Sequence, residues 1–137
     1  SLNNIGLVYY KKSDFDKAKD FYKKSYELYN KAYAKNPNHP SIANILNNIG
    51  LVYNKEGRYN TALEYFEESY EIKKKIHENN LNHPDIADVL NNIGLAYHKK
   101  SLEYLEKSYE IKKKIYADNP DHHSLIRSLN NIRMVKN

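Results

Sequence analysis

Apolar residues recur every three or four positions along most of the chain, which is the spacing of an amphipathic helix. The clearest stripe follows Pro40 and consists of Ile42, Ile45, Leu46, Ile49, Val52 and Tyr53. Pro40 suits the first turn of a helix, where a missing N–H is harmless, and Gly57 can end the helix. A second stripe is formed by Ala62, Phe66, Ser69, Ile72 and Ile76. The alternation typical of strands is absent, so the pattern predicts an all-α fold of helix–turn–helix units.

These units repeat along the 137 residues. The segment "LNNIGLVY" occurs four times, in full or in part, at 2–9, 46–53, 90–97 and 129–132. The segment "SYEIKKKI" occurs at 69–76 and again at 108–115. A helical pair with one apolar face per helix cannot bury that face alone, but stacked copies can. We therefore expect one array over residues 1–137, with repeats at roughly 1–38, 39–82 and 83–121 and a terminal helix at 122–137.

The repeated residues resemble those of the tetratricopeptide repeat, which places Leu, Ile, Gly and Tyr on its first helix (helix A). On its second helix (helix B) it places Ala, an aromatic residue and a small residue. The second unit carries this set as Leu46, Ile49, Gly50, Tyr53, Ala62, Phe66 and Ser69. The first carries Leu2, Ile5, Gly6, Tyr9, Ala18, Tyr22 and Ser25. The third carries Leu90, Ile93, Gly94, Tyr97, Ser101, Leu105 and Ser108.

The resemblance implies a right-handed α-solenoid that acts as a protein–protein interaction scaffold and not as an enzyme. The interval of about 44 residues is longer than the usual ~34. Together with "LNNIG" and "HPDIA", it is similar to the kinesin-light-chain type. The chain departs from the family in having Leu in place of Trp and in a helix B that continues through "IKKKI".

The third unit lacks five residues, those that match Gly57 to Thr61, which form the turn between helices A and B. Either these residues exist but are unobserved, or the two helices fuse into one from about Pro84 to Ala117. A fused helix would be about 50 Å long. Its halves could not pair with each other, so we would expect a domain-swapped dimer in place of a monomer. Both alternatives stay open.

In the resembled family, helix A lines a concave groove that holds a peptide. The residues of this chain that fall on that face are Asn3, Leu7, Tyr10, Asn44, Asn47, Asn48, Leu51, Asn54, Lys55, Asp88, Asn91, Asn92, Leu95, His98, Arg127 and Asn130. Asn is unfavourable in the interior of a helix, but its amide can hydrogen-bond a peptide backbone with little dependence on the sequence of that peptide. The alternative is that Asn links neighbouring A helices and Leu fills the gap between them.

Two other binding sites fit the sequence poorly. A family site that clamps a C-terminal carboxylate would need Lys, Asn and Arg where this chain has Asn3, Leu7, Asn48, Asp88 and Asn92. Only Asn48 fits, and Asp88 would repel an anion. A metal site built on His39, His83 and His122 would have one histidine in each layer, with no carboxylate or Cys to complete it. We expect these histidines to cap or pack helix starts, and we expect no cofactor.

Charge and composition narrow the function further. The net charge of +5 comes from 22 basic and 17 acidic residues, and the runs Lys73–Lys75 and Lys112–Lys114 suit solvated helix ends. A basic nucleic-acid surface is therefore a weak alternative. There is no cysteine, no charged-then-apolar signal segment and no apolar run long enough to span a membrane, so we expect a cytoplasmic protein. Because the chain starts at Ser1, inside a repeat, we expect it to be a fragment of a longer protein.

No catalytic grouping or Gly-rich phosphate loop is present. Tyr9, Tyr53 and Tyr97 fall on the core stripe, and we expect them to pack there. The sequence thus predicts a module that captures a peptide segment of a partner protein on its A-helix face. The remaining alternative is a structural spacer or an array that associates with itself.

Overall fold

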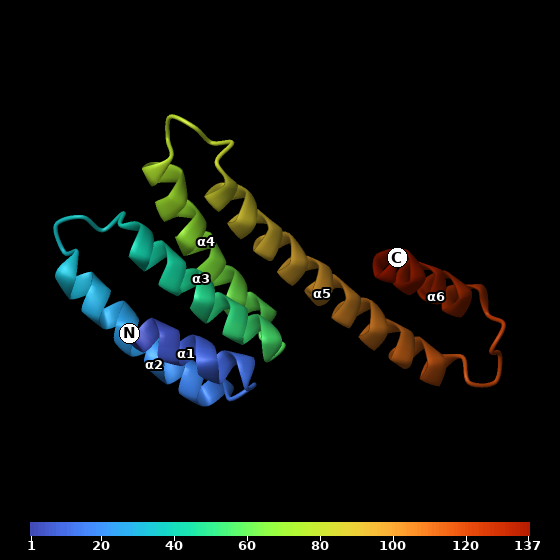
Figure 1. The fold of residues 1–137 in the computed structure, drawn as a ribbon. Coiled ribbons are helices and arrows are strands. Elements are labelled where there is room, and N and C mark those ends of the chain that lie inside the picture. The colour runs from blue at the N-terminus through green and yellow to red at the C-terminus, as the bar shows by residue number, and fades with distance from the viewer. The chain divides into compact units, whose positions relative to one another are not determined.

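The computed structural model describes residues 1–137 and contains six helices and no strand (Figure 1). The helices are α1 (Leu2–Lys11), α2 (Phe15–Ala32), α3 (Pro40–Lys55), α4 (Tyr59–Ile76), α5 (Pro84–Ile115) and α6 (His123–Lys136). The predicted all-α repeat fold is confirmed. The chain divides into two compact units, Ser1–Ala96 and Tyr97–Asn137, and α5 contributes to both.

Two helical hairpins, α1 with α2 and α3 with α4, form most of the first unit. Each hairpin turns at a residue with positive φ, which is Ser13 (φ 60°) in the first and Gly57 (φ 80°) in the second. The second turn is closed by the Arg58 N–H, which donates to the Tyr53 carbonyl at 2.9 Å. Gly adopts this backbone conformation without the steric cost that a side chain brings. The prediction that Gly57 ends the helix is therefore confirmed.

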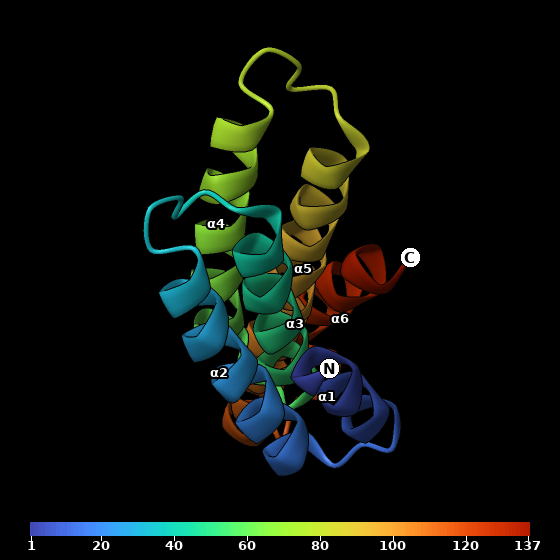
Figure 2. The ribbon, with the colours of Figure 1, turned by 60° about the vertical axis from the view of Figure 1, so that its left-hand side comes forward.

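The core of the first unit lies where the A and B helices of a hairpin meet. Figure 2 shows α2 and α4 along one side, with α3 and the start of α5 along the other. A Cβ added to Gly6 would lie 2.6 Å from ring carbons of Tyr22, and one added to Gly50 would lie 2.6 Å from Phe66. Both rings are almost fully buried. The absence of a side chain at these glycines lets the two helices of each hairpin approach closely.

Polar contacts strengthen the same packing. Within the second hairpin, the buried Ser69 hydroxyl donates to the Ala43 carbonyl at 2.8 Å. Between the hairpins, Lys19 Nζ pairs with Glu56 Oε1 at 2.9 Å. This hydrogen bond and the carboxylate charge of Glu56 raise the pKa of Lys19. The two hairpins are thus joined by an ion pair as well as by apolar contact.

Helix α5 runs without interruption through the position where the first two repeats turn (Figure 1). Of the two alternatives for the third unit, the structure therefore has the fused helix, and the predicted third hairpin does not form within the chain. The physical reason is local. No Gly or Pro stands between Gly94 and Pro120, and the residues at the join are compatible with a helix.

The fused helix leaves exposed several residues that are buried in the second hairpin. Leu46 is 2% exposed, whereas the matching Leu90 is 45% exposed. Tyr53 is 6% exposed, whereas the matching Tyr97 is 50% exposed. The prediction that Tyr97 lies in the core is therefore wrong, because no B helix of its own repeat covers it.

The second unit consists of α6 and the part of α5 after Ala96. Its buried side chains are Leu125, Ser128 and Ile132, all on one face of α6. Lys112 Nζ donates to the Ser128 hydroxyl at 3.0 Å. Helix α6 thus packs on the end of α5 as the next A helix of the repeat would.

Candidate functional site

Asparagines join the A helices α1, α3 and α5 side by side. Asn48 Nδ2 donates to Asn3 Oδ1 at 3.0 Å, and Asn92 Nδ2 donates to Asn47 Oδ1 at the same distance. All four side chains are half-buried. Asparagine therefore does link neighbouring A helices, which was the alternative to a purely peptide-binding role. We call these two bonds the asparagine ladder.

The ladder uses only part of the hydrogen-bonding capacity of its side chains. An Asn amide has two N–H donors and an oxygen with two lone pairs, and each ladder bond occupies one donor and one lone pair. Asn44 and Asn91 lie on the same helices, are exposed and make no hydrogen bond through their side chains. The A-helix face thus offers both donors and acceptors to a polar chain.

Leucines accompany the asparagines at one position in each repeat. Leu7 is 40% exposed and Leu95 is 47% exposed, whereas Leu51 between them is half-buried against the core. Lys55, Asp88 and His98, the charged or titratable residues predicted for this face, are exposed.

Two predicted groove residues lie elsewhere. Tyr10 packs against the core beside Phe15, with ring centroids 6.1 Å apart, and burial raises the pKa of its hydroxyl. Asn54 is 9% exposed, and its Oδ1 is buried without a hydrogen-bond partner. Asn54 is therefore buried on the inward side of α3, whereas Tyr10 is partly buried against the core of the first unit. Arg127 and Asn130 are exposed on α6 in the second unit.

The three recurring histidines cap helix starts, as predicted. The Nδ1 atoms of His39, His83 and His122 accept from backbone N–H groups two residues later, each at 3.1 Å. Their rings stack at 3.6 to 3.8 Å on an aromatic side chain from the end of the preceding B helix: Tyr33, His77 and Tyr116, respectively. Each histidine therefore ties the end of one repeat to the start of the next.

One of these caps also brings together possible metal ligands, which the sequence analysis did not anticipate. Asp85 Oδ2 lies 3.1 Å from His77 Nε2 and 3.6 Å from His83 Nδ1. The expectation of one histidine per layer is therefore wrong here, because the loop after α4 folds back and adds His77. The two imidazole rings are stacked 3.7 Å apart with 11° between their planes. The ligand atoms of His77, His83 and Asp85 all lie within 4.8 Å of one another, but His83 Nδ1 already accepts a hydrogen bond from the Asp85 N–H at 3.1 Å.

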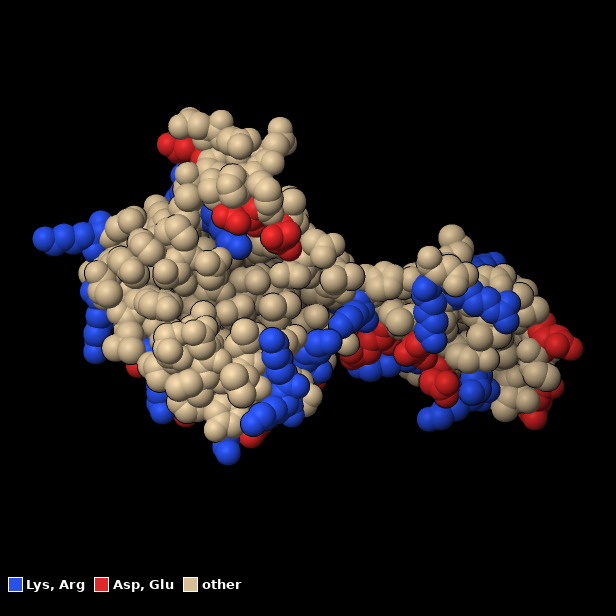
Figure 3. Space-filling model, viewed as in Figure 1, with Lys and Arg blue, Asp and Glu red and all other residues tan.

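The lysine runs do not form a basic patch. Lys73 is 7% exposed, which corrects the prediction that it lies on a solvated face. Lys74 pairs with Glu71 at 3.2 Å, and Lys113 pairs with Glu110 at 3.5 Å. On the face in view, Figure 3 shows acidic side chains beside many of the Lys and Arg side chains, several of which gather in the lower middle of the view.

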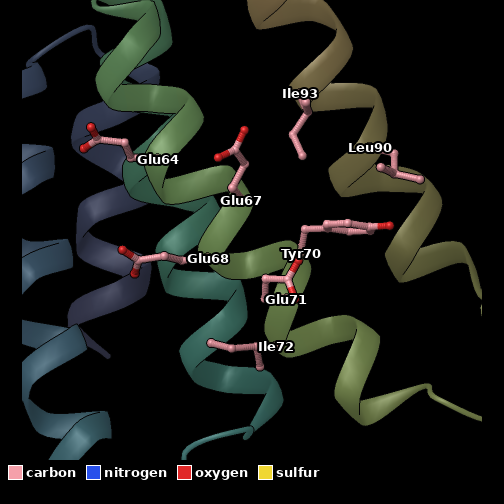
Figure 4. A pocket seen from close by; sticks show the side chains of 8 residues that line it. All are labelled: Glu64, Glu67, Glu68, Tyr70, Glu71, Ile72, Leu90 and Ile93. Carbon is pink, nitrogen blue, oxygen red and sulfur yellow. The ribbon is translucent and has the colours of Figure 1, made fainter.

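A hollow of about 790 Å³ lies in the first unit, between α4 and the first part of α5. Its lining includes four glutamates of α4, Glu64, Glu67, Glu68 and Glu71; Figure 4 shows Glu67 extending toward α5, whereas Glu64 and Glu68 extend from the other side of α4. Leu90 and Ile93 of α5 form the opposite wall, and Figure 4 shows Tyr70 extending from α4 toward Leu90. Sequence reasoning missed this hollow, because a helix B of the third repeat would have filled it.

None of the helices is both long and apolar enough to cross a membrane. A comparison with curated proteins gives no match. A family model described as "Tetratricopeptide repeat" matches residues 1–75, which is more than half of the chain and covers α1 to α3 and nearly all of α4. The kinesin-light-chain subtype stays a prediction. Stacked hairpins that pack an aromatic ring on a glycine, together with this match, show that the chain belongs to the tetratricopeptide repeat family, whose arrays serve as protein–protein interaction modules.

Proposed function

We propose that this chain binds an extended segment of a partner protein along the A-helix face formed by α1, α3 and the first part of α5. The asparagine ladder is the observation that carries the proposal, since it recurs in the same register between successive A helices. It sets these helices side by side and leaves amide donors and acceptors at the surface at each step.

The chemistry of this face suits a peptide backbone better than a charged ligand. A backbone N–H needs an acceptor and a backbone C=O needs a donor, and an uncharged Asn amide supplies both. Asn44 and Asn91 offer complete amides, while Leu7 and Leu95 offer apolar contact with alternate side chains of the ligand. Specificity then depends mainly on the apolar positions, because the amides contact groups common to all peptides.

The experiment uses exposed asparagines that the ladder does not employ. Peptides are selected on the chain from a phage-displayed random library, and their Kd values are measured by fluorescence polarisation. We expect the double variant Asn44→Ala, Asn91→Ala to weaken binding by about tenfold, at about 1 kcal/mol or less for each lost hydrogen bond. Its melting temperature should match that of the parent chain.

The matched control removes two exposed asparagines from B helices, Asn30→Ala and Asn60→Ala, and should bind as the parent does. Failure to select any peptide, or equal binding by both double variants, would contradict the proposal. Substitutions at Asn47 and Asn48 are less informative, because these residues hold neighbouring helices together. Loss of folding on their replacement would favour the alternative, a structural spacer.

A further inference from the structure

The third repeat keeps the residues of a hairpin but has no hairpin partner. In the first two repeats an aromatic ring fills the space beside the glycine of helix A. Beside Gly94, the matching glycine, no atom lies within 4 Å of an added Cβ. Ala87 is exposed, whereas the matching Ala43 is fully buried beneath α4. A helix-accepting surface is therefore present and uncovered.

The hollow between α4 and α5 has the composition of a site for a B helix. Its α5 wall is formed by Leu90 and Ile93, which match Leu46 and Ile49 of the second repeat. Those two are 2% and 1% exposed in the second hairpin, where helix B covers them. The element that completes the third repeat is thus a helix with a B-type face.

The chain itself contains such a segment, Ser101–Ile115 within α5. Leu105 and Ser108 stand where the second repeat has Phe66 and Ser69. The segment exposes large apolar side chains, with Tyr104 and Ile111 each 59% exposed. Within one continuous helix, however, Gly94 and Leu105 are separated by about 16 Å along the axis, so they cannot meet in the same copy.

We propose that Ser101–Ile115 of a second copy of this chain occupies the hollow beside Gly94, and that two copies exchange these segments reciprocally. The register follows from the second hairpin. Leu105 of the partner copy lies on Gly94 as Phe66 lies on Gly50, and the partner's Ser108 donates to the Ala87 carbonyl as Ser69 does to Ala43. Both contacts place the two α5 helices antiparallel, crossing near His98 and Lys99, which gives a closed two-fold dimer.

Charge complementarity supports this occupant and this direction. Helix α5 has Asp85 in its first turn and Lys112–Lys114 in its last turn, so antiparallel pairing brings acidic and basic ends together. The partner's segment is also more basic than α4. Where α4 has Glu68, the partner's segment has Lys107, which pairs with Glu103 of its own helix at 2.9 Å. The exchange places this lysine beside a helix that lines the hollow with four glutamates. The proposal is independent of peptide binding on the A-helix face.

The first test is the mass in solution by sedimentation equilibrium. The parent chain of 16.2 kDa should form a dimer of twice that mass as concentration rises. Gly94→Leu should raise the dimer Kd roughly 100-fold or more, because the overpacked contact occurs twice in a symmetric dimer. Helicity should be retained, since space beside Gly94 is open in the free chain. A chain that stays monomeric at millimolar concentration, or a dimer unaffected by Gly94→Leu, would overturn the proposal.

A second variant restores what the third repeat lacks. Insertion of the sequence of residues 57–61 between Lys100 and Ser101 should allow the hairpin to close within one copy and give a stable monomer. A dimer of unchanged affinity after this insertion would count against the exchange.

Cross-linking tests the register, since the chain has no cysteine of its own. The double variant Ala87→Cys, Ser108→Cys should form disulfide-linked dimers on mild oxidation. These positions are about 31 Å apart along one helix and cannot join within a copy. The control Ala87→Cys, Glu110→Cys moves one thiol to the opposite side of the helix and should cross-link at least tenfold more slowly. Equal rates for the two variants would refute the proposed register.

Discussion

The second hairpin and helix α5 carry nearly the same motif, yet they bury very different parts of it. In the second hairpin, Leu46, Gly50 and Tyr53 are buried under α4. In α5 the matching Leu90, Gly94 and Tyr97 are exposed, although the helix itself forms. The difference comes from five absent turn residues and not from the motif. Burial in a repeat protein thus depends on whether a connection lets the partner helix return.

The largest expected contrast is between Phe66, which packs on Gly50, and Leu105, the matching residue of α5. Phe66→Ala removes a fully buried ring and should lower the free energy of unfolding by about 3 to 5 kcal/mol. Leu105→Ala, measured at concentrations where the chain is monomeric, should cost under about 1 kcal/mol because Leu105 is only half-buried. Urea unfolding followed by circular dichroism measures both. Equal losses would mean that Leu105 is packed as Phe66 is.

A smaller contrast is expected at the glycines. Gly50→Ala places a Cβ 2.6 Å from the ring of Phe66 and should destabilise the chain by about 1 to 3 kcal/mol. Gly94→Ala meets no atom and should stabilise the dilute chain by about 0.5 to 1 kcal/mol through helix propensity. Thermal unfolding at low concentration compares the two. A destabilised Gly94→Ala monomer would show that a B helix already covers this site.

Alkaline pH should weaken the first hairpin through Tyr22. Burial raises the pKa of its hydroxyl from the ordinary 10.0 to about 12. Because the folded state favours the neutral phenol, this stabilisation is complete below pH 10 and is lost as the pH rises toward 12. The urea midpoint should therefore fall more steeply over this range in the parent chain than in Tyr22→Phe. Identical pH profiles would show that Tyr22 titrates normally.

The smallest contrast is expected between the histidine caps of α3 and α5, because these caps belong to the repeated sequence and do not depend on whether a B helix packs on the helix that each one begins. His39 begins α3 and His83 begins α5 with the same Nδ1 bond at 3.1 Å and similar stacking. Replacing either by Ala should cost about 1 kcal/mol, the usual value of an N-cap. Chemical denaturation of both variants measures this. A much larger loss of stability for one of the two variants would show that the two caps are not equivalent.

The sequence predicts well what is local. Apolar spacing, Pro40 and Gly57 give the helices and the second turn, and the histidine caps follow from their place before each helix. The sequence alone could not decide whether the third repeat forms a hairpin or one long helix, because the apolar stripe stays in phase across the join and is compatible with both a fused helix and unobserved residues. The ladder partners and the approach of His77 to Asp85 depend on how successive repeats stack, which spacing alone does not specify.

The most direct test of the account is a distance along α5. Spin labels are attached through Asp88→Cys and Glu110→Cys, diluted with unlabelled chain, and measured by double electron–electron resonance. One continuous helix predicts about 33 Å between these positions. The reference pair in the second hairpin, Asn44→Cys with Glu71→Cys, should give a far shorter distance, near the ~10 Å spacing of packed helices plus the label arms. A short distance for the α5 pair within one chain would show that the third repeat closes on itself and would contradict the account.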